Sequence, residues 1–256
     1  MKRDYFLVKL STVRMESEKM KIIKTKNNEE LSNKAAELFV QALQRKKQPV
    51  IGLATGSTPE RMYELLIEQY RAGKISFEQA ISFNLDEYVG LSVEHPTSYH
   101  YYMEEKLFHA IDIKKENTHI PNGLAEDLEK ECEAYEQKIS RAGHLDFLVL
   151  GIGVNGHIGF NEPGTSFDSR THVVTLTEST REVNSRFFEK LADVPKEAIT
   201  MGLSTIMEAK EIMLLVQGDK KADILNKVIH GEVTEDIPAS ILQRHPNTTV
   251  ITDIEI

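Results

Sequence analysis

The sequence predicts an α/β fold, in which a Rossmann-like, mostly parallel sheet is covered by helices on both faces of a single domain. Short apolar runs that indicate strands alternate along the chain with longer segments of helical periodicity. This alternation is typical of parallel sheets, because each crossover between parallel strands needs a helix-length connection. The 256 residues suffice for one large α/β domain, and no internal repeat or linker divides them.

The strands are predicted from short apolar runs. The run at 50–54 contains no charged residue, which indicates a strand that is buried on both faces, as in the interior of a parallel sheet. The run at 147–150 has the same character and is followed by glycines. The predicted strands are residues 22–23, 50–54, 81–84, 147–150, 173–174, 211–216 and 248–252.

Helices are predicted between these runs, where apolar residues recur three or four positions apart. The first is preceded by Asn27 and Glu30, which stand in the positions of a capping box. Pro59 stands in the first turn of the second, where a missing N–H is tolerated. Cys132 lies on the apolar face of another and is therefore expected in the core. The predicted helices are residues 31–42, 59–70, 98–108, 124–139, 178–188 and 219–230.

Composition argues against several kinds of partner. The net charge of −9 disfavours nucleic acid, because phosphate backbones recruit clustered Lys and Arg. Cys132 is the only cysteine, so no internal disulfide can form, and a reducing compartment such as the cytoplasm is expected. No apolar run approaches the length of a membrane span, so no membrane partner is expected.

Residues 1–19 fit none of the predicted elements. The segment starts with basic residues and its apolar stretch is interrupted by Lys9, which makes it a poor secretion signal. We therefore expect residues 1–19 to be a poorly ordered N-terminal extension. Residues 20–256, beginning at Met20, are expected to form a single α/β catalytic domain.

A glycine-rich segment after the run at 147–150 carries the strongest functional signal. Gly151, Gly153 and Gly156 satisfy the G-x-G-x-x-G pattern of dinucleotide-binding folds, which requires a helix to open at the third glycine. Here Gly159 and the Glu-Pro-Gly string at 162–164 follow instead, and glycine and proline at this density break a helix. We therefore expect a loop rather than a nucleotide site.

This loop displays His157 and Glu162, five residues apart. The free imidazole titrates near neutrality, so His157 can both take and give a proton. Glu162 is placed to orient the imidazole and to stabilise its charged form. The pair favours proton transfer, and the alternative is a hydrogen-bonded histidine with a structural role in the loop.

Two adjacent carboxylates, Asp86 and Glu87, follow the strand predicted at 81–84. Neighbouring side chains on an extended backbone point in opposite directions, so only one of the two is expected to face a ligand. A carboxylate at this edge of the sheet could serve as a general base. The alternative is a pair of solvated or helix-capping acids.

A turn rich in glycine and hydroxyl groups joins the strand at 50–54 to the helix that follows. Its members are Thr55, Gly56, Ser57 and Thr58. Such a turn offers unpaired N–H groups and a favourable helix dipole to an anion. The same groups also suit a plain N-cap by Ser57 or Thr58, and the local sequence does not separate the two.

Two cations, Arg186 and Lys221, are candidate phosphate ligands. Arginine offers a planar fork of donors and lysine a point charge. For either residue alone, a solvated charge on a helix is the alternative.

These segments together resemble the glucosamine-6-phosphate deaminases. The matching strings are GLATGSTP at 52–59, FNLDEYVGL at 83–91, HPTSY at 95–99, GHIGFNEP at 156–163, SRT at 169–171 and NSRFF at 184–188. The likeness runs from about Met20 to the C-terminal strand. Several long strings in one order are far more specific than a single glycine pattern.

The resemblance implies conversion of glucosamine 6-phosphate to fructose 6-phosphate and ammonia, without a metal or an organic cofactor. It implies that Asp86 moves a proton from C2 to C1, and that His157 opens the pyranose ring with Glu162 as its partner. The positions that match substrate ligands are Thr55, Gly56, Ser57, Arg186 and Lys221 for the phosphate and Gly151 near a sugar hydroxyl. The C2 proton becomes acidic enough for a carboxylate only after the ring opens, so the reaction needs two proton-transfer groups.

The chain departs from a common form of the family pattern in two places. Many relatives have Asp two residues before the loop histidine, where this chain has Asn155. An amide can orient His157 by a hydrogen bond but cannot stabilise imidazolium as a carboxylate does, so we keep Asn155 as an accessory site residue and expect the relay to depend on Glu162. Allosteric relatives have basic residues after the Ser-Arg-Thr string, whereas residues 172–174 are His-Val-Val. We therefore expect an unregulated enzyme that is a monomer or a weak homo-oligomer.

Three alternatives stay open. A 6-phosphogluconolactonase-like hydrolase would have a related glycine-histidine loop but should lack the Asn-Leu-Asp-Glu-Tyr string at 84–88. A sugar-phosphate-sensing module would need a DNA-binding segment, for which residues 1–19 are too short. A catalytically weakened paralogue is compatible with Asn155.

Overall fold

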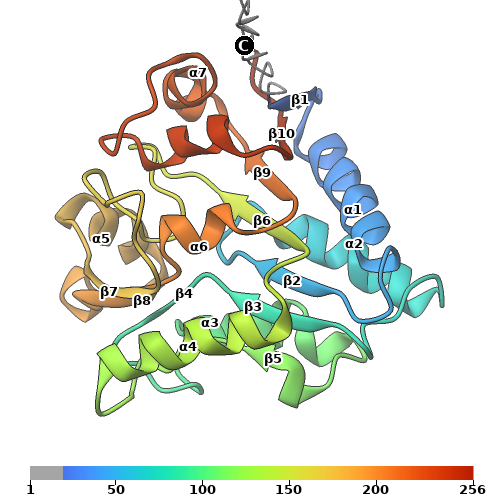
Figure 1. Ribbon diagram of the computed structural model, residues 1–256, viewed down its shortest axis with the longest axis horizontal. Helices are drawn as coiled ribbons and strands as arrows, with labels where there is room; N and C mark the ends of the chain where they lie inside the picture. Colours follow the sequence, from blue (N-terminus) through green and yellow to red (C-terminus); the bar gives the residue numbers. More distant parts are fainter. Residues whose placement is uncertain (1–19, 256) are drawn as a thin grey trace, which may run out of the picture.

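The protein, as a computed structural model that describes residues 20–255, is organised around a seven-stranded sheet (Figure 1). The strand order is β1-β10-β9-β6-β2-β3-β5, and each neighbouring pair is parallel. The strands are β1 (Lys21–Lys24), β2 (Val50–Leu53), β3 (Ile81–Asn84), β5 (Thr118–His119), β6 (Phe147–Gly151), β9 (Ile212–Val216) and β10 (Thr248–Thr252). The prediction of an α/β fold with a mostly parallel sheet is confirmed.

Helices cover both faces of this sheet, as predicted (Figure 1). Phe147 and Val149 of β6 belong to the core on one face of the sheet, whereas Leu148 and Leu150 belong to the core on the other face. Successive strand residues face opposite sides, so a strand covered on both faces must be apolar throughout. The helices are α1 (Asn28–Gln44), α2 (Glu60–Arg71), α3 (Tyr99–Lys106), α4 (Leu128–Ala142), α5 (Glu178–Asn184), α6 (Leu203–Met207) and α7 (Ala222–His230). Short 3-10 helices are η1 (Phe108–Ala110), η2 (Lys115–Asn117), η3 (Ser185–Phe187), η4 (Leu191–Asp193), η5 (Asp219–Lys221) and η6 (Pro238–Arg244).

A second, three-stranded antiparallel sheet was not predicted. It consists of β4 (Asp86–Tyr88), β8 (Glu197–Thr200) and β7 (His172–Thr175) in the order β4-β8-β7. The predicted strand at 173–174 is therefore real but lies in this sheet. Residues 86–88, which we expected to follow a strand, form a strand of their own.

The helix ends differ from the predictions in detail. Asn27 caps α1 by accepting a hydrogen bond from the Glu30 backbone N–H, as in a capping box. The Glu30 carboxylate, however, accepts from the backbone N–H of Lys26 rather than that of Asn27. Pro59 is the N-cap of α2 rather than its first residue. Cys132 is buried, as predicted.

No helix in residues 20–255 is long and apolar enough to cross a membrane. The expected extension at 1–19 lies outside the described residues.

Candidate active site

The candidate side chains lie at one edge of the central sheet. The loops that carry them follow β2, β3, β6 and β9, which are neighbours in the order β9-β6-β2-β3. Because these strands are parallel, their carboxyl ends share one edge, where ligands of open α/β sheets bind. Arg186 comes from η3 and is exposed, and the effect of its charge on Lys221 after β9 favours a place near the same edge.

Asp86 and Glu87 have opposite surroundings, as the extended backbone of β4 requires. The Glu87 carboxylate is buried at the start of α3, where it accepts from the backbone N–H groups of Tyr99 and His100 at 3.0 Å and lies 2.8 Å from His100 Nδ1. Asp86 is 6% exposed, and burial together with the charge of Glu87 raises its pKa to about 8. One acid therefore stabilises a helix, and the other is left as a carboxyl group of raised pKa, whose ionised form is a stronger base than that of a solvated aspartate.

The loop after β6 is packed against Asp86. A Cβ on Gly159 would lie 3.6 Å from Asp86 Oδ2 and 2.9 Å from Thr200 Oγ1, and Gly159 has a φ of +58° that favours glycine. Thr200 is the β8 partner of Asp86, and its hydroxyl accepts from the Phe160 backbone N–H at 3.0 Å. The segment two residues after His157 thus lies directly beside the Asp86 carboxylate.

His157 faces Glu162 within this loop. His157 Nδ1 lies 3.6 Å from Glu162 Oε2, an ion-pair distance that is longer than a hydrogen bond. Within the described residues, this buried nitrogen has no hydrogen-bond partner. The imidazole is therefore held close to a carboxylate without a hydrogen bond to it.

Asn155 acts on the loop differently from what we expected. Its Oδ1 accepts from the His157 backbone N–H at 3.2 Å, and its Nδ2 donates to Glu162 Oε2 at 2.8 Å. The amide therefore orients the carboxylate and the backbone, and the imidazole ring is not its hydrogen-bond partner. An aspartate in this place would repel Glu162, so asparagine suits this arrangement.

Glu162 is held in its charged form. Burial alone would raise its pKa, but the nearby His157 and the hydrogen bonds from Thr180 and Asn155 lower that pKa to about 2. The carboxylate is thus ionised across the physiological range.

The turn after β2 does not serve as an ordinary side-chain cap. Among the described residues, no side chain caps α2, so neither Ser57 nor Thr58 does so. Gly56 has a φ of +94°, and its carbonyl accepts from the Tyr102 hydroxyl at 2.7 Å. The observation favours the anion-binding alternative, because the N-terminal groups of the helix are left without the usual side-chain partner.

Arg186 and Lys221 place two positive charges close together. Burial lowers the pKa of Lys221, the charge of Arg186 lowers it further, and Asp253 opposes the shift. Two positive charges that interact repel one another, and an anion bound between them would stabilise both. Gly151 at the end of β6 opens on space, since a Cβ there would meet nothing within 4 Å.

Thr177 and Thr180 were missed as site residues. Both hydroxyls contact Glu162 from the start of α5. Their Thr-x-x-Thr spacing before a helix predicts an N-cap, which Thr177 indeed forms. The cap could have been predicted, but nothing local to it indicates contact with a carboxylate fifteen residues away.

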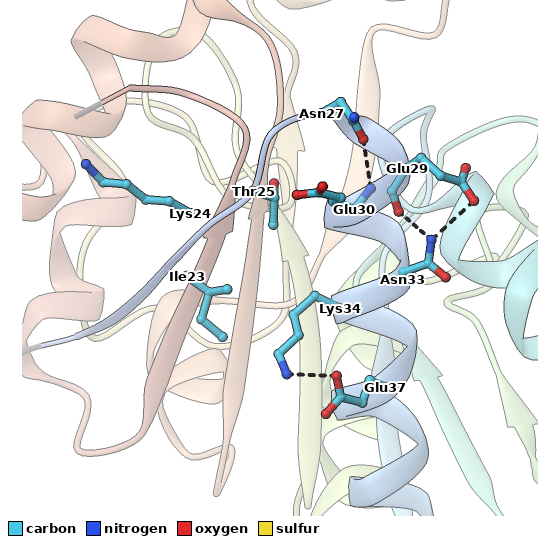
Figure 2. A pocket seen from close by; sticks show the side chains of 9 residues that line it. All are labelled: Ile23, Lys24, Thr25, Asn27, Glu29, Glu30, Asn33, Lys34 and Glu37. Carbon is cyan, nitrogen blue, oxygen red and sulfur yellow. Dashed lines mark hydrogen bonds and ion pairs between the residues drawn. The ribbon is translucent and has the colours of Figure 1, made fainter.

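A separate depression of about 710 Å³ lies between β1 and α1 (Figure 2). Its side chains largely pair with one another, as Lys34 does with Glu37 and Asn33 with Glu29. None of the candidate site residues lines it. Within the described part of the chain, no group of three or more His, Cys, Asp or Glu side chains is placed to hold a metal ion.

Comparison with known proteins agrees with the resemblance. Residues 24–251 match the family described as glucosamine-6-phosphate isomerases/6-phosphogluconolactonase. The glucosamine-6-phosphate deaminase of Thermoanaerobacter pseudethanolicus is 55% identical over 236 residues, 92% of this chain and 93% of the relative. That of Shouchella clausii is 57% identical over 236 residues, 92% and 96% of the two chains. The chain therefore belongs to this family, and within it to the glucosamine-6-phosphate deaminases.

Solved structures support the same placement. A monomeric glucosamine-6-phosphate deaminase superposes with a TM-score of 0.90 at 49% identity, covering 91% of this chain and 97% of that chain. The 6-phosphogluconolactonase of Thermotoga maritima superposes with a TM-score of 0.71 at 21% identity, covering 91% and 98%. The second likeness shows the common fold alone.

Proposed function

We propose that this chain converts glucosamine 6-phosphate and water to fructose 6-phosphate and ammonia. The observation that carries the proposal is the Asp86 carboxylate, whose pKa is raised to about 8 and which lies against the loop that holds His157. The identity of about 55% to glucosamine-6-phosphate deaminases supports the substrate. A basic carboxylate beside an imidazole–carboxylate pair provides two proton-transfer groups in one site.

The two groups act in sequence in this proposal. His157, which lies beside the Glu162 carboxylate, moves the proton that converts the cyclic sugar to the open aldehyde. The carbonyl at C1 then makes the C2 hydrogen acidic, and Asp86 takes it and returns it at C1. A proton from the amino nitrogen passes to the C1 oxygen, which leaves a hydroxyl at C1 and an imine at C2. Water hydrolyses the imine to the ketone and ammonia. Each step is a proton transfer or a hydrolysis, so no metal or organic cofactor is required.

The substrate phosphate is proposed to bind at Thr55, Gly56, Ser57, Arg186 and Lys221. The uncapped start of α2 supplies backbone N–H groups, and the two side-chain cations supply charge. Gly151 leaves space for a sugar hydroxyl. Binding the phosphate at one end fixes the reacting carbons between Asp86 and His157.

Replacing Arg186 with alanine is expected to raise KM for glucosamine 6-phosphate by about 10- to 100-fold, equivalent to about 1.4–2.8 kcal/mol. The kcat should fall by no more than a few fold, because most of the phosphate contact is made in both the ground state and the transition state. Steady-state kinetics check this. An unchanged KM would remove Arg186 from the phosphate site.

Replacing Gly153 with alanine is expected to lower kcat by about 10- to 100-fold through His157. A Cβ at this position would lie 2.2 Å from His157 Cε1, so the ring must move, while the backbone at Gly153 is not in the left-handed region. The control is a double-mutant cycle with His157→Ala. In the His157→Ala background, Gly153→Ala should lower kcat only slightly further. A full additive loss of kcat would contradict the explanation.

The proposed activity is tested by incubation with glucosamine 6-phosphate in the presence of EDTA, with assays for ammonia and fructose 6-phosphate. Hydrolysis of 6-phosphogluconolactone without ammonia release would favour the lactonase alternative. Binding of sugar phosphates without turnover would favour the sensing module or a weakened paralogue. Loss of activity with EDTA would contradict metal independence.

We further propose an unregulated cytoplasmic enzyme whose catalytic domain is residues 20–256 and which is a monomer or a weak homo-oligomer. The monomeric relative at 49% identity and the absence of Lys and Arg at 172–174 support this. Hyperbolic kinetics that N-acetylglucosamine 6-phosphate leaves unchanged are expected. Sigmoidal kinetics relieved by that compound would overturn the proposal.

A further inference from the structure

The two carboxylate oxygens of Glu162 have different partners. Oε2 accepts from Asn155 Nδ2 at 2.8 Å and faces His157 Nδ1 at 3.6 Å. Oε1 accepts a hydrogen bond from the Thr180 hydroxyl and lies 3.3 Å from the Thr177 hydroxyl. Both threonines belong to the start of α5, which is a different element from the loop that carries Glu162. One oxygen of Glu162 therefore faces the imidazole of His157, and the other is held by residues outside the loop.

The threonine side of this arrangement is a directed chain of hydrogen bonds. Thr177 Oγ1 caps α5 by accepting from the Thr180 backbone N–H at 3.2 Å. The Thr177 hydroxyl donates in turn to Thr180 Oγ1 at 3.1 Å. Thr180 is only 6% exposed, and its single hydroxyl hydrogen is directed at Glu162. Each bond in such a chain polarises the next, so the carboxylate is fixed more firmly than one isolated contact would fix it.

The same segment carries the proposed phosphate ligand. The helix α5 ends at Asn184 and continues directly into η3, which contains Arg186. After η3, Phe188 packs edge-on against Tyr88 of β4, with ring centroids 5.8 Å apart. Residues 177–188 therefore contact the relay carboxylate at one end and the strand of Asp86 at the other.

We propose that Thr180 is a positioning residue for the deamination reaction, which holds Glu162 so that its second oxygen faces His157, and that Thr177 supports it. The inference rests on the proposed function. Because α5 also leads to Arg186, the orientation of the relay is tied to the segment that binds the phosphate. Substrate phosphate bound at that segment would then stabilise the working geometry of the imidazole and carboxylate.

The test compares Thr180→Val with Thr180→Ser in ammonia-release kinetics. Valine keeps the volume and removes the hydroxyl, so kcat should fall by about 10-fold or more while KM changes by less than about threefold. Serine keeps the hydroxyl and should restore kcat to within about threefold of the wild type. Thr175→Val is the matched control, since Thr175 is exposed on β7 and should leave both parameters unchanged.

A double-mutant cycle of Thr180→Val with Arg186→Ala tests whether the orientation of Glu162 is coupled to the phosphate-binding segment. The Thr180→Val penalty on kcat should be smaller in that background than in the wild type. If Thr180→Val prevents folding, the pair Thr177→Val and Thr177→Ser tests the same chain of hydrogen bonds. A wild-type kcat in Thr180→Val, or equal losses of kcat in Thr180→Val and Thr180→Ser, would overturn the inference. Absence of ammonia release by the wild type would instead overturn the proposed function.

Discussion

Replacing Asp86 with asparagine is expected to lower kcat by about a thousandfold or more while KM changes little. Asparagine has nearly the same shape but cannot accept the C2 proton, and a well-placed general base contributes about 100- to 10,000-fold. The loss should appear in kcat because the proton moves in the transition state. Ammonia-release kinetics with purified variants measure both parameters. A near-normal kcat would remove Asp86 from the role of base.

The same substitution is expected to stabilise the fold, and increasingly so as the pH rises. The folded pKa of Asp86, about 8, lies above the ordinary value of 3.8. Stability from the neutral carboxyl is fully present below pH 4 and is lost as the pH rises through 8. Asparagine avoids this loss, so urea unfolding at pH 8 should show a gain on the order of 3 kcal/mol, with little gain at pH 4.

Glu87→Gln is the matched control for this gain in stability. Glu87 is also buried, but its carboxylate accepts hydrogen bonds from the start of α3, so removing its charge should cost about 1–3 kcal/mol. Neighbouring carboxylates in one strand should thus respond in opposite directions. Stabilisation by both substitutions would show that the effect comes from the acidic net charge of the chain rather than from the burial of Asp86.

The central sheet was predictable because apolar runs mark its buried strands and segments of helical periodicity alternate with them along the whole chain. The run at 147–150 is apolar at every position, since Phe147 and Leu148 must enter different cores. The second sheet has no such signal. Its strand β4 has three residues and contains the two acids 86 and 87, and a strand this short leaves no periodicity that distinguishes it from a turn.

The site was predictable only as far as its residue types carry chemistry. Asp86, His157 and Glu162 belong to strings that suit proton transfer, whatever the surrounding fold. Whether Ser57 caps a helix or leaves it uncapped depends on backbone geometry that the string itself does not encode. Thr180 is the extreme case, because a threonine near a helix start is ordinary and only the tertiary contact with Glu162 makes it unusual.

Replacing His157 with glutamine is expected to lower kcat/KM for glucosamine 6-phosphate by about 100- to 10,000-fold, the usual contribution of an acid–base group. It should also change which step limits the rate. If His157 opens the ring before Asp86 takes the C2 proton, slow ring opening will hide the later step. The kinetic isotope effect with substrate deuterated at C2 should therefore fall toward one in the His157→Gln variant.

Asp86→Glu supplies the opposite case. It keeps a carboxylate but displaces it by one methylene, so proton transfer from C2 should become slower relative to ring opening and the isotope effect should rise. If two different groups catalyse two consecutive proton transfers, the isotope effect must fall in His157→Gln and rise in Asp86→Glu. A single group that served both steps would move the isotope effect in one direction in both variants, and that result would leave His157 without a separate step to catalyse.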